Sequence, residues 1–208
     1  MNAIALTRIA AFRHHVSYPA LLLGTLSALC AALLNGTSNA TAPAIAAANR
    51  IDRLNAIAAV MPASAYDSDP LAHCQPASGA MALELCPLSL NGQPAGTIAS
   101  LSSGGYGGPI RLLLGVDGRG VITGVRVLSH SETPGLGDLI ERSKSPWIDS
   151  FNGHSLANTS QQQWAVRKDG GDFDQFTGAT ITPRAVVGGV HHALSQIAAR
   201  AATQEQQP

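Results

Sequence analysis

The sequence predicts an α+β protein in which one N-terminal transmembrane helix precedes a domain built on a mainly antiparallel sheet with flanking helices. Three observations support this prediction. A long uncharged apolar run lies near the start, strand-like segments separated by turn residues fill the middle, and an amphipathic helical pattern follows near the end. Hydrophobic residues make up 45% of the 208 residues, enough for a core, whereas charged residues make up only 12%, which is low for a soluble protein.

The apolar run, residues 16–34, contains no charged side chain. As a helix, about 19 residues at ~1.5 Å each span roughly 28 Å, close to the hydrocarbon thickness of a bilayer. Basic but no acidic residues occur in 1–15, and the next basic residue is Arg50. This asymmetry predicts a cytoplasmic N-terminus and an extracytoplasmic remainder. The alternative is a cleaved signal peptide, for which Asn39–Ala42 offers a small-x-small site.

Residues 35–79 are expected to form a linker and a stalk helix. Small and polar residues fill 35–43, which predicts a juxtamembrane linker. From Ala44 to Val60 apolar side chains recur at helical spacing, and Met61-Pro62 ends the pattern. This helix either contacts neighbouring subunits or packs on its own domain.

Residues 80–200 form the predicted domain, and 201–208 a polar tail that we expect to be disordered. Turn signals such as Asp117-Gly118 separate the expected strands and indicate hairpins. A short helix is expected over Asp138–Ser145, closed by Pro146-Trp147. The expected strands are Met81–Leu88, Gly96–Ser102, Ile110–Val116 and Val121–Ser129.

The three cysteines lie far apart in the sequence, at Cys30, Cys74 and Cys86, and no C-x-x-C occurs. We therefore expect no metal and no Fe–S cluster bound by this chain alone. Cys74 and Cys86 form either a disulfide, if the domain lies outside the cytoplasm, or two free buried thiols. No basic stripe interleaved with aromatic residues is present, so nucleic-acid binding is not expected.

The last predicted helix follows a polar loop that contains glycine, residues 170–181. Thr182 can cap this helix and Pro183 suits its first position. A helix N-terminus favours an anion, so a phosphate-bearing ligand near Thr180 is one interpretation, and an ordinary loop with a threonine cap is the other. The apolar face of the helix comprises Val186, Val190, Ala193, Leu194 and Ile197.

The stretch Asp174–Thr180, Asp-Gln-Phe-Thr-Gly-Ala-Thr, resembles the D-x-x-[S/T]-G-A-T motif of the FMN-binding domain family. In that family a flavin transferase uses FAD and Mg²⁺ to join FMN, through its phosphate, to the hydroxyl of the last threonine. The resemblance implies that Thr180 carries covalent FMN and that the transferase reads Asp174. Thr177, Gly178 and Ala179 complete the implied site.

A second family element, E-T-P-G-L-G, is matched without a departure by Glu132–Gly137. Pro134-Gly135 makes a fixed turn. Backbone N–H groups from Gly135 to Gly137 can face the pyrimidine edge of a flavin, Leu136 can form an apolar wall, and Glu132 and Thr133 can hold the turn. The alternative is a purely structural loop. The glycine-dense segment 104–110 resembles a further family segment that lies beside the flavin.

Most of the chain resembles the G subunits of Rnf (Rsx) electron transport complexes and, more distantly, the C subunits of sodium-translocating NADH:quinone reductases. The resemblance implies a bacterial inner-membrane flavoprotein with a periplasmic FMN domain, which relays electrons beside other subunits of an ion-translocating complex. We expect no catalytic residue for a substrate in this chain itself. Two alternatives stay open, a flavin-binding sensory or regulatory domain and a structural subunit that never receives flavin.

Overall fold

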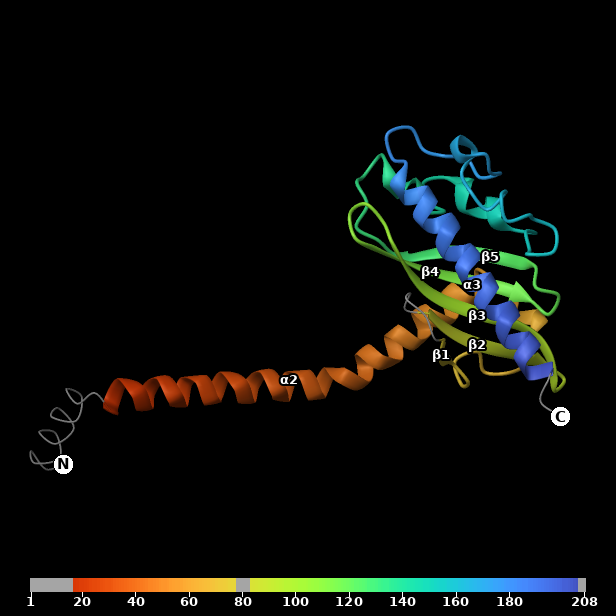
Figure 1. Ribbon diagram of the computed structural model, residues 1–208. Coiled ribbons are helices and arrows are strands. Elements are labelled where there is room, and N and C mark those ends of the chain that lie inside the picture. Colours follow the sequence, from red (N-terminus) through yellow and green to blue (C-terminus); the bar gives the residue numbers. More distant parts are fainter. Residues whose placement is uncertain (1–16, 78–82, 206–208) are drawn as a thin grey trace, which may run out of the picture. The chain divides into compact units, whose positions relative to one another are not determined.

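The computed structural model describes residues 17–77 and 83–205, and the chain divides into two compact units between Ile51 and Asp52. The predictions for residues 1–15 and for the start of the first expected strand at Met81 lie outside the described residues. The elements are α2 (Ser17–Ala58), β1 (Gln75–Ala77), β2 (Leu83–Leu90), β3 (Gln93–Gly104), β4 (Pro109–Asp117), β5 (Ile122–Ser129) and α3 (Ile181–Glu205), with short 3-10 helices η1 (Ala63–Ala65), η2 (Gly137–Ile140), η3 (Pro146–Phe151) and η4 (Arg167–Asp169) (Figure 1).

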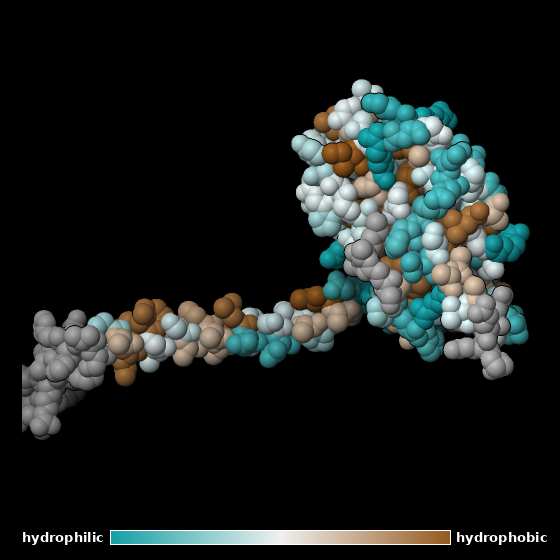
Figure 2. Space-filling model, viewed as in Figure 1, coloured by the Kyte–Doolittle hydropathy of each residue, from teal (hydrophilic) through white to brown (hydrophobic). Residues whose placement is uncertain are grey.

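The N-terminal helix α2 is much longer than the predicted span. Its 42 residues extend over about 63 Å, roughly twice the hydrocarbon thickness of a bilayer. Among the described residues it is the one helix long and apolar enough to cross a membrane. Figure 2 shows apolar side chains around its N-terminal part, where the exposed large side chains are Leu21, Leu22, Leu23, Leu26, Leu29, Leu33 and Leu34.

The linker predicted over 35–43 is helical instead, so α2 runs on without a break. The small polar side chains there bond back to the preceding turn of the helix. The Asn35 amide donates to Ala31 O at 2.9 Å, and the Thr37 hydroxyl donates to Leu33 O at 2.9 Å. These residues therefore stay compatible with a helix. The alternative cleavage site Asn39–Ala42 lies inside α2.

The domain contains one five-stranded sheet in the order β1-β2-β3-β4-β5, and every neighbouring pair is antiparallel. All four expected strands are confirmed, and the short edge strand β1 is an addition. At the predicted Asp117-Gly118 hairpin, the Asp117 carboxylate accepts the backbone N–H groups of Arg119 and Val121, both at 2.9 Å. These bonds fix the turn between β4 and β5.

The two faces of the sheet bury separate cores, because side chains alternate along each strand. Helix α3 packs on one face, mainly on β3, through the predicted apolar side chains, of which Val186, Val190, Ala193 and Leu194 are buried (Figure 1). The other face is covered by residues at and beyond the end of α2, including Ile57 and Met61. The stalk therefore packs on its own domain at its end, whereas Ile45 is exposed.

The backbone of Val60 lies in a slot that two glycines leave in the sheet. Gly115 and Gly124 face each other across β4 and β5. A Cβ atom at Gly115 would lie 2.5 Å from Val60 O, and one at Gly124 would lie 2.8 Å from Val60 Cα. The Thr123 hydroxyl donates to Val60 O at 2.5 Å. The strand glycines thus allow the chain after α2 to dock directly on the sheet.

Replacing Gly115 with alanine is expected to destabilise the domain by about 1–3 kcal/mol, because the new Cβ meets backbone that cannot move aside cheaply. Urea unfolding of the full chain in detergent measures the effect. Gly118→Ala is the matched control, since the nearest atom to its added Cβ lies at 3.4 Å, an ordinary contact. Equal urea midpoints for the two variants would show that Val60 is not held in the slot.

The segment between β5 and α3 is mostly irregular and corrects one prediction. Only Gly137–Ile140 of the helix expected over Asp138–Ser145 forms a short 3-10 turn, and Glu141 is already extended. Lys144 folds back to Asp138 at 2.8 Å, which favours a compact turn over a helix. At the C-terminus α3 continues to Glu205, so residues 201–205 of the expected tail are helical.

Candidate functional site

Three segments that are distant in sequence meet at the buried carboxylate of Glu132, which is 5% exposed. The backbone N–H of Gly107, in the glycine-dense segment, donates to Glu132 Oε1 at 3.0 Å. The hydroxyl of Thr182, in the first turn of α3, donates to Glu132 Oε2 in a short hydrogen bond. The carboxylate therefore joins the Glu132–Gly137 motif to the glycine-dense segment and to the first turn of α3, which directly follows the Asp174–Thr180 motif.

Glycines make this close approach possible. A Cβ atom at Gly107 would lie 2.0 Å from Ser131 O, and one at Gly137 would lie 2.8 Å from Glu132 Oε2 and 3.0 Å from Thr182 Oγ1. Gly178 has a φ of +82°, and a Cβ there would lie 3.2 Å from Leu136 Cδ2. The Glu132–Gly137 and Asp174–Thr180 motifs, about 40 residues apart in the chain, are therefore in contact through Leu136 and Gly178.

The start of α3 differs from the prediction at Thr182. The helix begins at Ile181, and Thr182 does not cap it but lies buried in its first turn, bonded to Glu132. Thr180 directly precedes the helix and is partly buried. Its hydroxyl has no hydrogen-bond partner among residues 17–77 and 83–205. Thr177, also predicted to lie in the site, is exposed.

Two ion pairs hold the loop in front of α3. Arg167 pairs with Asp174 at 2.9 Å, with both side chains more than 60% exposed. Arg184 binds Asp169 through two contacts, of 2.5 and 2.8 Å, and this pairing lowers the pKa of Asp169. The Arg184 guanidinium is therefore already committed to a protein carboxylate, while the Asp174 carboxylate is accessible at the surface.

A cluster of buried aromatic side chains packs against the loop in front of α3 that carries Asp174. Both tryptophans and three of the four phenylalanines of the chain belong to it. Phe173 stacks on Phe151 with ring centroids 4.5 Å apart and on Trp164 at 5.5 Å. Trp147 contacts Phe176 edge-to-face at 5.0 Å and donates its indole N–H to Asp174 O at 2.8 Å. The loop is thus anchored on a packed aromatic core.

A charged network lies behind the Glu132–Gly137 motif. The backbone N–H of Glu132 donates to His130 Nδ1 at 3.0 Å, so the imidazole proton sits on Nε2, which donates to Glu141 at 2.8 Å. Lys144 bonds both Asp138 and Glu141. The Lys144 ammonium and the His130 N–H lower the pKa of Glu141 to about 2, and Lys144 also lowers the pKa of Asp138.

This network predicts a loss of stability in acid. The pKa of Glu141 falls from an ordinary 4.5 to about 2 on folding, so its contribution is complete above pH 4.5 and is lost as the pH falls toward 2. Lys144→Gln removes the main cause and is expected to flatten the fall in Tm over that window. Lys144→Arg, which keeps the charge, is the control. Parallel Tm profiles for wild type and Lys144→Gln would contradict this assignment.

The motif residues are surrounded by exposed apolar side chains. Tyr106 is 72% exposed in the glycine-dense segment, Leu136 is 41% exposed, and Ile181 beside Thr180 is 48% exposed. Each of these side chains presents apolar surface in or beside a motif or the glycine-dense segment. The arrangement suits a flat ligand that has an apolar ring and a phosphate.

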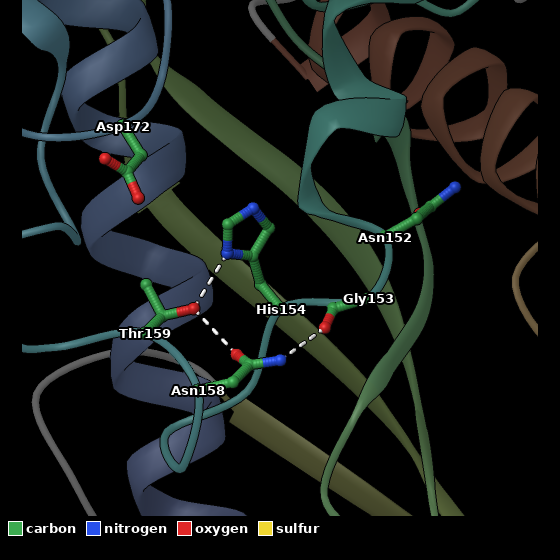
Figure 3. A pocket seen from close by; sticks show the side chains of 6 residues that line it. All are labelled: Asn152, Gly153, His154, Asn158, Thr159 and Asp172. Carbon is green, nitrogen blue, oxygen red and sulfur yellow. Dashed lines mark hydrogen bonds between the residues drawn. The ribbon is translucent and has the colours of Figure 1, made fainter.

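A separate shallow pocket of about 300 Å³ contains none of the predicted site residues (Figure 3). In it the Thr159 hydroxyl lies 2.8 Å from both His154 Nδ1 and Asn158 Oδ1, and the Asn158 amide donates to Gly153 O. These bonds order the polar loop of residues 152–159. We assign the pocket a structural role.

Sequence reasoning identified the two motifs but missed how they are joined. The family resemblance places Glu132 in the flavin site as a residue that holds the turn, and the structure shows its carboxylate between Gly107 and Thr182. Thr182 was interpreted as a cap. A glutamate within an otherwise small and glycine-rich element was the signal for an internal partner, because a buried carboxylate needs hydrogen-bond donors.

Comparison with known proteins shows which class of protein has this site. The FMN-binding domain family matches residues 105–195, which contain all but the first residue of the glycine-dense segment, both motifs and most of α3. The chain is therefore an FMN-binding-domain protein with an N-terminal apolar helix.

Its relatives are more specific. The chain is 48% identical to the G subunit of the ion-translocating oxidoreductase complex of Stutzerimonas stutzeri, over 94% of this chain and 87% of the relative. It is 46% identical to that of Cereibacter sphaeroides, over 84% and 81%, and 44% identical to that of Pseudomonas aeruginosa, over 89% and 90%. The chain belongs to the family of ion-translocating oxidoreductase complex G subunits.

Proposed function

We propose that this chain is the membrane-anchored flavoprotein subunit of an ion-translocating electron transport complex and carries FMN as a phosphoester on Thr180. The observation that carries the proposal is the convergence of the two motifs. Leu136 meets Gly178, Glu132 meets Thr182, and Thr180 is left at the start of α3 with a hydroxyl free of protein partners among the described residues.

The residues fit this cofactor. The backbone N–H groups in the first turn of α3 have no acceptor within the helix, which favours a phosphate beside Thr180. Gly135 and Gly178 both have positive φ and are exposed, so no side chain covers the backbone there, although the N–H groups of Leu136 and Gly137, expected to face the flavin, both bond to Thr133 O at 3.1 Å. Tyr106, Leu136 and Ile181 supply apolar surface for a ring. When bound, FMN accepts and donates electrons one or two at a time.

In the proposed attachment reaction, the Thr180 hydroxyl is the acceptor of the FMN phosphate. The Thr180 oxygen forms the new O–P bond, the P–O–P bond of FAD breaks, AMP leaves, and the hydroxyl proton is released. A separate flavin transferase supplies the catalytic groups for this step. The exposed carboxylate of Asp174, oriented by Arg167, is available for recognition by that enzyme. We propose no substrate-directed catalytic residue in this chain.

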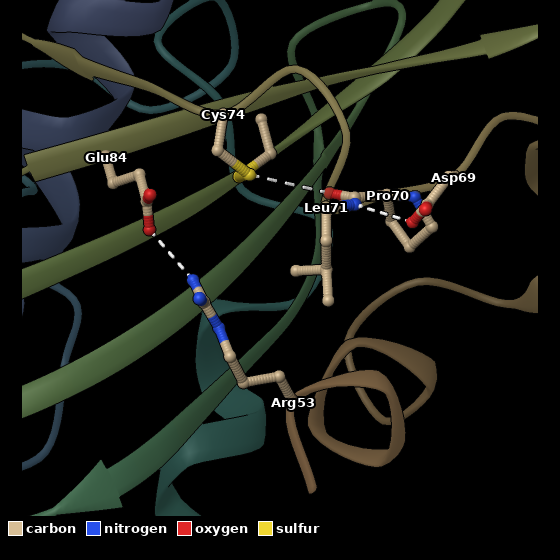
Figure 4. The surroundings of a disulfide bond; sticks show 7 residues. Arg53, Asp69, Pro70, Leu71, Cys74 and Glu84 are labelled. Carbon is tan, nitrogen blue, oxygen red and sulfur yellow. Dashed lines mark hydrogen bonds and ion pairs between the residues drawn. A yellow bond between two sulfur atoms is a disulfide. The ribbon is translucent and has the colours of Figure 1, made fainter. Parts of the chain in front are cut away.

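A disulfide supports the proposed periplasmic placement of the domain. The structure joins Cys74 to Cys86, beside the Arg53–Glu84 ion pair (Figure 4). Disulfides form and persist outside the cytoplasm and are rare within it. Together with the basic residues before the apolar run, this supports an N-terminus in the cytoplasm and a domain on the other side of the inner membrane.

Purification of the tagged full chain from membranes, in mild detergent and with its transferase present, tests the function. We expect yellow chain that keeps its flavin absorbance through denaturing gel filtration, together with co-purifying integral subunits. Flavin without partner subunits would favour the sensory alternative. Partner subunits without flavin would favour a structural subunit.

A further inference from the structure

We infer that Glu132 is a positioning residue for Thr180 and not a ligand of the flavin. This inference rests on the proposed attachment of FMN to Thr180. Both carboxylate oxygens of Glu132 are engaged by protein donors, Oε1 by the Gly107 N–H and Oε2 by the Thr182 hydroxyl. At 5% exposure, the side chain has little surface left for a ligand.

Glu132 holds Thr182, a residue in the first turn of α3. Thr182 lies two residues after Thr180, so a fixed Thr182 fixes the position of the acceptor hydroxyl. The opposite side of the carboxylate is held by the glycine-dense segment, where a Cβ at Gly105 would lie 2.2 Å from Oε1. The backbone of Glu132 is itself held by His130, through the bond to Nδ1. Movement of this carboxylate would therefore move Thr180 relative to the Leu136 loop.

Both oxygens of Glu132 accept hydrogen bonds, as those of an ionised carboxylate do, so Glu132 also brings a negative charge to this site. Within the described part of the chain it forms no ion pair, and its charge faces the N-terminal turn of α3, whose dipole is positive. A phosphoester on Thr180 would share the same helix end. Glu132 thus influences the charge that a flavin attached to Thr180 experiences.

The test uses the full chain in detergent, purified without flavin and then incubated with transferase, FAD and Mg²⁺. Thr182→Val removes the hydroxyl with little change of shape, and Glu132→Gln removes the charge with little change of size. We expect both variants to take up FMN about ten- to a hundredfold more slowly than wild type, because misplacement by about 1 Å can cost about a hundredfold in rate. Thr182→Ser is expected to restore the rate.

Thr203→Val is the control, since exposed Thr203 lies on the same helix and, among the described residues, its hydroxyl bonds only Ala199 O within that helix. Two further measurements distinguish a role of Glu132 in positioning Thr180 from a general loss of stability. Amide exchange at Gly107 in the flavin-free chain is expected to accelerate in Glu132→Gln. The midpoint potential of the flavin fraction that does form is expected to become more positive, because a nearby negative charge has been removed.

The outcomes are distinguishable from failure of the proposed function. If wild type takes up no FMN, that function is wrong, while Gly107 exchange still tests the positioning contact. If wild type is loaded, but both variants load at the wild-type rate with unchanged Gly107 exchange and potential, Glu132 is not a positioning residue.

Discussion

Thr180→Ala is expected to abolish covalent flavin while leaving the domain folded. The hydroxyl is the proposed acceptor, so its removal leaves no oxygen at that position to form the O–P bond. The side chain is partly exposed and has no hydrogen-bond partner among the described residues, so its loss should change stability by no more than about 0.5 kcal/mol. In-gel flavin fluorescence after denaturation, compared with Tm, measures both effects.

The neighbouring hydroxyl of Thr177 provides the control for Thr180. It lies in the same motif, three residues earlier, and is exposed. Thr177→Ala is expected to keep its fluorescence, and Thr180→Ser, which retains a hydroxyl, is expected to keep at least part of it. Loss of fluorescence in Thr177→Ala with retention in Thr180→Ala would move the attachment point to Thr177.

Phe173→Ala is expected to destabilise the domain by about 3–5 kcal/mol, the range for removal of a buried aromatic side chain. Phe173 is 1% exposed and stacks between Phe151 and Trp164. Its backbone also pairs with Ala165 and Arg167, at 3.2 and 2.8 Å. The loop that carries Asp174 begins at the next residue, so flavin attachment should fall together with stability.

Urea unfolding of the full chain measures the free-energy change for Phe173→Ala. Phe173→Leu retains most of the apolar volume and is the control, with an expected loss of less than half as much. Flavin incorporation is measured well below the urea midpoint of each variant. If the aromatic cluster supports the loop as well as the fold, incorporation falls more in the alanine variant than in the leucine variant. Equal incorporation would mean that the aromatic cluster supports the fold but not the loop.

Much of the fold follows from local patterns in the sequence. Alternating apolar residues and turn signals locate strands β2 to β5, and the apolar face from Val186 to Leu194 locates α3. Two expectations fail, the linker over residues 35–43 and the helix over Asp138–Ser145. Residues 35–43 are helical, with the Thr37 hydroxyl bonded back to Leu33 O, whereas the Lys144 ammonium turns back to the Asp138 carboxylate and Glu141 is extended.

The candidate site is foreseeable only in part. The motifs containing Thr180 and Leu136 are visible in the sequence, and their resemblance to a known family assigns both of them to one flavin site. Contacts between distant segments are not visible in this way. The Glu132–Thr182 bond spans 50 residues, and the slot for Val60 forms where β4 and β5 place Gly115 opposite Gly124. Such contacts depend on tertiary structure rather than on local propensity.

The intact mass of the full chain, expressed with and without the flavin transferase and followed by peptide mapping, tests the central proposal most directly. We predict a gain of one FMN less one water only when the transferase is present, located on the peptide that contains Thr180. An unchanged mass, or a gain located on another residue, would contradict this prediction.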